Sequence, residues 1–182
     1  GFALSINFFL TPTISIVIPK IVKFILGLGA KEVGIINAML SLGTLGGMLL
    51  LSILPESDKS FQFFSKGLLM QGVALTLLGF FLIPLIATNL NNLVIFILYC
   101  CLVLVIGCAL SLVNIPLSVS YQKIIPDEYR GRVFAMIFTL SAGITPIGIA
   151  LIGYLADVVM PGYIFLVGGI IITALTSWMF FI

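Results

Sequence analysis

The sequence predicts an all-α, polytopic membrane protein with six transmembrane helices. Its 182 residues are 62% hydrophobic and only 8% charged, and the mean hydropathy is +1.35. A soluble domain carries about 25% charged residues, because charged side chains must cover its surface. Here the solvent that faces most of the surface must be lipid. The apolar residues also gather in long runs, and almost every charge lies between two runs.

Six runs are long enough to cross a bilayer as helices. A transmembrane helix needs about 20 mainly apolar residues, and none of these runs contains Lys or Arg. The predicted spans are residues 2–19, 33–54, 67–87, 93–119, 133–156 and 162–182. A membrane barrel is excluded, because its strands would alternate in polarity over short segments. The whole chain, 1–182, is therefore predicted to form a single transmembrane domain.

The distribution of basic residues predicts the orientation in the membrane. The second and fourth connections carry five Lys and Arg residues, whereas the first, third and fifth together carry three. The positive-inside rule places the second and fourth connections, and both chain ends, in the cytoplasm. The net charge of +2 is too small and too dispersed to indicate binding of nucleic acid. Because the chain starts at Gly1 inside an apolar run, we interpret it as a fragment or processed piece that lacks an N-terminal part.

Glycine and proline occur at corresponding places in the first and second triplets of spans. Pro12 and Pro116 interrupt spans one and four, while spans two and five are rich in glycine. Missing side chains let membrane helices approach closely, either as static packing or as surfaces that slide. The candidate packing residues are Gly43, Gly47, Gly143 and Gly148. The correspondence predicts two inverted three-helix repeats, an arrangement found in many transporters.

A few polar residues inside the spans are candidates for lining a substrate cavity: Asn7, Thr11, Asn114 and Thr145. Asn7 and Asn114 lie near the prolines of spans one and four. The alternative is an interhelical hydrogen bond that only holds the bundle together, worth about 0.6 kcal/mol. No Asp, Glu, Arg or His lies near the middle of a span, and the three cysteines have no histidine beside them. We therefore predict no catalytic residues, no metal and no cofactor.

The densest charge cluster lies in the fourth connection and comprises Asp127, Glu128, Arg130 and Arg132. Asp127 follows Pro126 and is predicted to cap the next helix. Glu128 and Arg132 are four residues apart and are expected to pair. The cluster is either a solvated helix end that anchors the topology, or a cytoplasmic latch whose ion pairs form in one conformational state and break in another.

The segment from Tyr121 to Asp157 resembles permeases of the major facilitator superfamily, and it is closest to the branch of macrolide-efflux permeases and the enterobactin exporter. The similarity rests on Pro126-Asp127-Glu128-Tyr129-Arg130-Gly131-Arg132-Val133-Phe134, followed by Pro146, Gly148, Gly153 and Ala156-Asp157. Asn7 with Pro12, and the cluster from Gly43 to Gly47, are similar to helices seven and eight of that branch. The chain would then correspond to helices seven to twelve. Residues 55–59 depart from the family, because they lack its usual loop signature.

The resemblance implies that the first, second, fourth and fifth spans face a central cavity and that the third and sixth lie outside. It implies a non-enzymatic function: export of an amphipathic organic small molecule across a cell membrane, by resemblance the bacterial cytoplasmic membrane. The partners would be the lipid bilayer, the substrate and a missing N-terminal six-helix half. The alternatives are an uptake permease of the same fold, a self-associating half-transporter, and a membrane receptor or scaffold that transports nothing.

Overall fold

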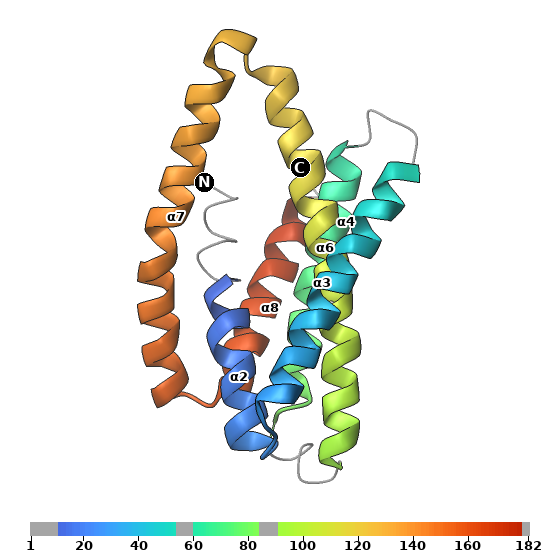
Figure 1. Cartoon of the computed structure of the whole chain (residues 1–182), viewed down its shortest axis with the longest axis vertical. Helices are drawn as coiled ribbons and strands as arrows, with labels where there is room; N and C mark the ends of the chain where they lie inside the picture. Colours follow the sequence, from blue (N-terminus) through green and yellow to red (C-terminus); the bar gives the residue numbers. More distant parts are fainter. Residues whose placement is uncertain (1–10, 54–59, 84–90, 180–182) are drawn as a thin grey trace.

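The computed structural model describes residues 11–53, 60–83 and 91–179, and every regular element in these ranges is helical (Figure 1). Five helices are long and apolar enough to cross a membrane: α3 (Ala30–Ile53), α4 (Ser60–Phe80), α6 (Asn92–Ile124), α7 (Asp127–Val158) and α8 (Pro161–Met179). The prediction of an all-helical chain with several membrane-spanning helices is confirmed. The predicted arrangement as two inverted repeats stays a prediction.

The long helices alternate in direction, so their connections lie at opposite ends of the bundle in turn. In Figure 1, the corner between α6 and α7 is at the top, where α3 also ends and α4 begins. The turn between α7 and α8 is at the bottom, together with the connection at residues 26–29. The second and fourth connections therefore share one end, as the predicted topology requires. The side of the membrane that each end faces remains a prediction.

The first helical stretch extends further than predicted. It comprises η1 (Thr13–Val17), α2 (Ile18–Lys20) and η2 (Ile21–Ile25), whereas the prediction ended at residue 19. Lys20 and Lys23 thus belong to a helix and not to a loop. Apolar residues continue between the two lysines, and long lysine side chains can bury their stems while the ammonium reaches the polar zone. The predicted residues 2–10 of this span, Asn7 among them, lie outside the described ranges.

Two parts of this stretch, η1 and η2, are π-helical. Pro19 has no N–H with which to donate a hydrogen bond to the carbonyl of Ser15, so an α-helical ladder is broken there. Bonds that span five residues are found nearby, such as the 3.0 Å bond from the Leu26 amide to the Ile21 carbonyl. Single π turns are a known response to such an interruption inside a helix.

Prolines fix where the later helices begin and end. Ile125 precedes Pro126 and has an extended backbone (φ −89°, ψ 123°), which ends α6, because a residue before proline disfavours the α conformation. Pro161 opens α8, a position at which the missing N–H costs nothing. At the start of α6, the Asn91 side chain accepts a hydrogen bond of 3.1 Å from the Leu93 amide, which caps the helix.

The bounds of two helices differ from those of the predicted spans, and the spans themselves stay a prediction. The fourth connection was predicted between residues 119 and 133, but α6 runs to Ile124 and α7 starts at Asp127. The third span was predicted at 67–87, whereas α4 starts at Ser60 and ends at Phe80. Pro84 cannot donate a hydrogen bond to the carbonyl of Phe80, which favours the earlier end. Hydropathy marks the hydrocarbon zone, and helices extend beyond that zone.

Helices α3 and α6 are in backbone contact through glycines. A Cβ atom added to Gly43 would lie 2.0 Å from the carbonyl oxygen of Leu104, and one added to Gly107 would lie 2.2 Å from that of Leu40. A Cβ on Gly47 would lie 2.7 Å from another carbonyl oxygen of α6. Real Cβ atoms do not approach oxygen this closely, so no larger residue fits. Gly43 and Gly47 therefore lie at the kind of interface that the sequence predicts for them.

Helix α4 packs between α6 and α8. Its contact with α8 is again close, because a Cβ on Gly72 would lie 2.4 Å from Thr173 Oγ1 and one on Gly79 would lie 2.5 Å from the Leu166 amide nitrogen. On the side of α6, the buried Tyr99 hydroxyl donates a 2.9 Å hydrogen bond to a carbonyl of α4. The helices α3, α6, α4 and α8 thus form one continuous row of tight contacts.

Helix α7 stands apart from this row. Its buried residues are Gly148, Ile152 and Ala156, and residues 127–147 include none. Its contacts are mainly with η1, which agrees with its separate position in Figure 1. Gly143 is exposed, and a Cβ added there would meet no atom within 4 Å. The packing role predicted for Gly143 is therefore not seen among the described residues, because no atom of another helix comes close to it.

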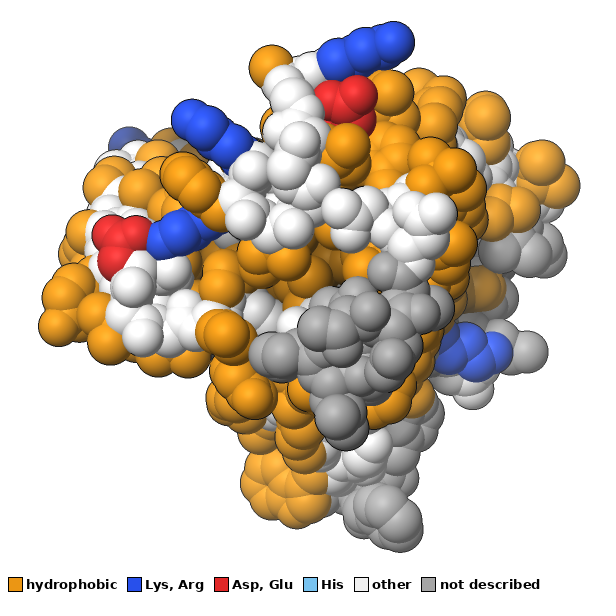
Figure 2. Space-filling view, turned by 90° about the horizontal axis from the view of Figure 1, so that it is seen from below, with side chains coloured by type: hydrophobic (Ala, Val, Ile, Leu, Met, Phe, Trp, Pro, Cys, Tyr) orange, Lys and Arg blue, Asp and Glu red, His pale blue; other side chains and the backbone are white. Residues whose placement is uncertain are grey.

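The outer surface of the bundle is strongly apolar. Large hydrophobic side chains are exposed on all five long helices, for example Leu49, Phe80, Ile97, Met136 and Ile170. Figure 2 shows the end of the bundle at which α7 turns into α8: a few charged side chains stand among a mostly hydrophobic surface. A surface of this kind would aggregate in water, whereas in a bilayer it is matched to its solvent. This agrees with a multi-pass membrane protein.

The close contact between α3 and α6 gives a direct test. Gly43→Ala and Gly107→Ala are expected to lower the free energy of unfolding by about 1–3 kcal/mol each, the usual range for overpacking a core. Gly46→Ala is the matched control, because nothing lies within 4 Å of an added Cβ there. Unfolding of the purified chain in mixed micelles would be followed by helical circular dichroism. Equal stability of all three variants would contradict the described interface.

Candidate functional site

The residues predicted to line a substrate cavity are not gathered by the described structure. Asn7 lies outside the described ranges, and Thr11 and Asn114 are exposed. Thr145 is half-buried, and its hydroxyl donates a 2.8 Å hydrogen bond to the Ser141 carbonyl within α7. That bond is internal to one helix, so it fixes no neighbour. The three that are described, Thr11, Asn114 and Thr145, do not line the pocket described below.

The residues predicted to form a latch lie in the first two turns of α7, and Arg130 joins this helix to α6. Its Nη2 atom lies 2.5 Å from Asp127 Oδ1 and donates a 2.8 Å hydrogen bond to the carbonyl of Gln122. Gln122 belongs to the last turn of α6, whose carbonyls have no partner inside the helix. A positive charge is favourable at that end of a helix. Arg130 therefore holds the corner between the two helices.

Two details of the predicted cluster need correction. The N-cap position of α7 is taken by Pro126 and carries no side-chain capping bond, whereas Asp127 is already the first helical residue. Asp127 instead pairs with Arg130, three residues further on. The expected pair of Glu128 and Arg132 is not formed among the described residues, and both residues are exposed. Glu128 still favours this end through the helix dipole.

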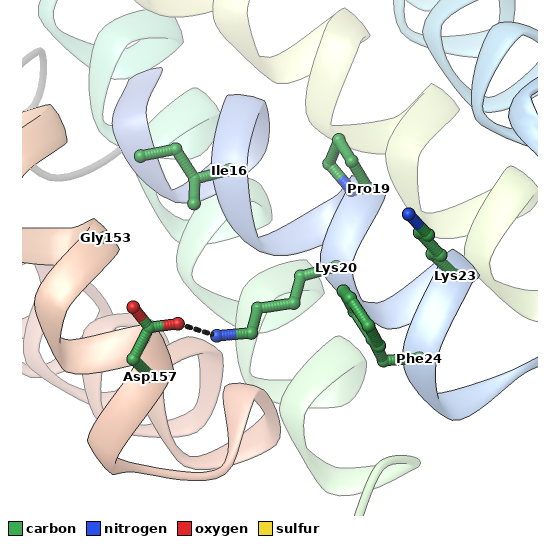
Figure 3. Close-up of a pocket in the computed structure, with 7 residues that line it drawn as sticks. All are labelled: Ile16, Pro19, Lys20, Lys23, Phe24, Gly153 and Asp157. Carbon is green, nitrogen blue, oxygen red and sulfur yellow. Dashed lines mark hydrogen bonds and ion pairs between the residues drawn. The ribbon is translucent and has the colours of Figure 1, made fainter.

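A pocket of about 390 Å³ lies where the first helical stretch meets the end of α7 (Figure 3). We call it the Lys20 pocket; it is lined by Ile16, Pro19, Lys20, Lys23, Phe24, Gly153 and Asp157. In Figure 3, Lys20 extends across the gap toward Asp157. Gly153 leaves room on the α7 side, since the nearest atom to an added Cβ is 3.9 Å away on Ile16.

The charges of the Lys20 pocket hold two segments together that are far apart in the sequence. The Lys20 ammonium pairs with Asp157 and also donates a hydrogen bond to the carbonyl of Ala156. Asp157 lies in the last turn of α7, where the helix dipole disfavours a negative charge, and Lys20 offsets this. The Lys20 side chain is 25% exposed and that of Asp157 is 76% exposed. The contact is therefore solvated enough to open without burying a lone charge.

Sequence reasoning missed this ion pair. The predicted spans leave Lys20 and Lys23 in the first connection, and Asp157 is named only within the resemblance. The π turns before and after Lys20 change the direction in which its side chain leaves the helix, and no periodicity shows this. The one available signal is that Asp157 is a carboxylate at the edge of a span, a place where a basic partner is expected.

Gln71 on α4 is the least satisfied polar side chain in the described bundle. It is fully buried, and neither atom of its amide has a hydrogen-bond partner there. A buried amide without a partner costs about 1–3 kcal/mol. The glycines on either side, Gly67 and Gly72, are in close contact with α6 and α8, so the amide lies between two tight helix contacts.

The ion pair between Lys20 and Asp157 should be measurable as a coupling energy. In a double-mutant cycle of Lys20→Met and Asp157→Asn, we expect about 0.2–1 kcal/mol, as for other partly exposed pairs. The coupling should fall at high salt because the pair is solvated. Unfolding of the purified chain gives the measurement, with Lys31→Met as an exposed control at the same end. A coupling indistinguishable from zero at low salt would contradict the contact.

Comparisons with known proteins add no family assignment. Searches against protein-family models, curated proteins and solved structures returned no match for this chain. The resemblance to the major facilitator superfamily therefore rests on the residues quoted for it, and what it implies about function is a proposal.

Proposed function

We propose that this chain is one half of a secondary active transporter that works by alternating access. The observation that carries the proposal is the contrast between two parts of the bundle. Helices α3, α6, α4 and α8 are joined by backbone-close contacts, whereas α7 buries only residues near its end. A transporter needs a rigid part and a part that moves against it.

The attachment of α7 supports this division. At one end α7 is joined to α6 by Arg130, and at the other it is joined to the first helical stretch by Asp157. Both connections are polar and partly exposed, so they can break and re-form at a modest cost in free energy. The exposed part of α7, residues 127–147, contains Ser141, Gly143 and Thr145 among apolar residues. Such a face suits a cavity or a partner helix better than lipid alone.

The direction and the substrate are taken from the resemblance. The chain would export an amphipathic organic compound. The resemblance also implies a second six-helix half, which would pack on the open side of α7. The two halves would be the repeats that rock against each other, with the cavity between them. The polar residues described near the centre of the bundle are all uncharged. The group that couples transport to an ion gradient would therefore lie in the other half.

Reconstitution tests the proposal. In liposomes with an imposed pH gradient, the 182-residue chain alone is expected to show no gradient-driven flux of a hydrophobic cationic dye, because one wall of the cavity and the coupling group are missing. Flux is expected when a complementary six-helix half is present. Flux by the chain alone would indicate a self-associating half-transporter, and no flux in either case would contradict transport.

Arg130 gives a sharper test in the complete transporter. Arg130→Glu is expected to reduce the export rate about tenfold, which corresponds to about 1.4 kcal/mol, because it breaks the contacts to Asp127 and to the end of α6. Exchanging the charges with Asp127→Arg in the same chain should restore part of the rate. Arg132→Glu is the matched control, since its side chain forms no ion pair among the described residues. Equal export by all variants would show that the cluster only anchors the topology.

A further inference from the structure

The Lys20 pocket lies at the depth of lipid headgroups. Helix α3 has 24 residues, which is about 36 Å at 1.5 Å per residue, so the bundle is longer than a hydrocarbon core of about 30 Å. Lys20 is less than two turns from the end of η2 at Ile25, and Asp157 is one residue from the end of α7. Each headgroup layer is about 5–8 Å deep, and the pocket falls within it.

The pocket offers both a positive and a negative group to a ligand. Lys23 lines it one turn after Lys20 and has no carboxylate partner among the described residues. Asp157 uses only Oδ1 in its ion pair with Lys20, and its side chain is 76% exposed, so its second oxygen is open to a donor. Figure 3 shows the Lys23 nitrogen well away from the carboxylate. The two groups therefore suit the two separated charges of one ligand.

The remaining lining residues are apolar. Ile16, Pro19 and Phe24 form this part of the wall, and the Phe24 side chain is largely exposed on the outer surface. From the pocket toward the membrane centre, the first helical stretch and α7 continue with apolar surfaces. A ligand with charges at one end and long apolar chains at the other would match both zones at once.

We propose that the Lys20 pocket binds the headgroup of a zwitterionic phospholipid that carries a primary amine. The phosphate lies against the ammonium groups of Lys23 and Lys20, and the lipid ammonium donates hydrogen bonds to the free oxygen of Asp157. A purely anionic lipid would meet the carboxylate of Asp157 as a like charge. A quaternary ammonium headgroup has no N–H to donate, so it makes a weaker contact. The proposal goes beyond the transport function and does not depend on it.

Native mass spectrometry of the purified 182-residue chain tests this site. The chain would be extracted from liposomes of equal parts phosphatidylethanolamine, phosphatidylcholine and phosphatidylglycerol, and the bound lipids counted. The wild type is expected to retain the ethanolamine lipid about threefold or more over each of the others, the preference that partly exposed ion pairs can support. A wild type without this preference, or with one for phosphatidylglycerol, would overturn the proposal.

Variants assign the binding to the pocket. Lys23→Met leaves the Lys20–Asp157 pair intact and should lower retention of the ethanolamine lipid about threefold. Asp157→Asn should remove the preference over phosphatidylcholine, and Asp157→Glu should keep it, which separates loss of charge from loss of fold. Lys31→Met is the matched control at the same end of the bundle and should behave as the wild type. Wild-type retention by both Lys23→Met and Asp157→Asn would overturn the site.

Competition by a water-soluble headgroup shows whether the ligand is a lipid or a free zwitterion. Glycerophosphoethanolamine has the same headgroup without acyl chains, so it should compete poorly if the apolar wall contributes. Displacement of the bound lipid at equal concentrations of the competitor would show that the pocket takes a free zwitterion, and this would overturn the assignment to a lipid. Displacement only at a large excess supports the lipid.

Discussion

The close approach of helix backbones at glycine is the constraint on which the rest of this bundle depends. In lipid there is little hydrophobic force between helices, so packing must come from contact area and from backbone proximity. Gly43 and Gly107 give α3 and α6 that proximity, and Gly72 and Gly79 give it to α4 and α8. The four helices are fixed relative to one another because a single methyl group at these points would force them apart.

Helix α7 is held mainly near one end, by the burial of Ile152 and Ala156 and by the ion pair of Asp157, and this difference divides the molecule. Its ends are joined to the other helices by Arg130 and by Asp157, whereas residues 127–147 include no buried residue. Dispersion contacts between backbones act only at short range, so a glycine interface has essentially one stable geometry. Ion pairs act over longer distances and tolerate small displacements. The structure therefore combines a row of four helices with one fixed geometry and a helix, α7, that can shift relative to that row.

Much of the fold could be predicted from the sequence, because the bilayer makes hydropathy a strong signal. Helices α3, α4, α6, α7 and α8 each overlap a predicted span, and Gly43 and Gly47 lie at an interface. The helical turns outside the spans could not be predicted, since hydropathy does not report that charged turns at Lys20 and Asp127 continue a helix. The Lys20–Asp157 pair could not be predicted, because it joins residues 137 positions apart and depends on how two helices rotate. The predicted cavity residues were chosen by polarity alone, which does not say where a side chain points.

The π turns of the first helical stretch have a consequence for insertions and deletions. A π turn accommodates one residue more than an α turn over nearly the same rise, so η1 and η2 are places where the chain can change length without a new loop. Removing one residue between Thr13 and Val17 would convert the turn to α, and the helical residues on either side of it would keep the faces that they present. In related chains that differ in length here, alignment by gaps placed in loops would therefore assign the wrong residues to the face that meets α7.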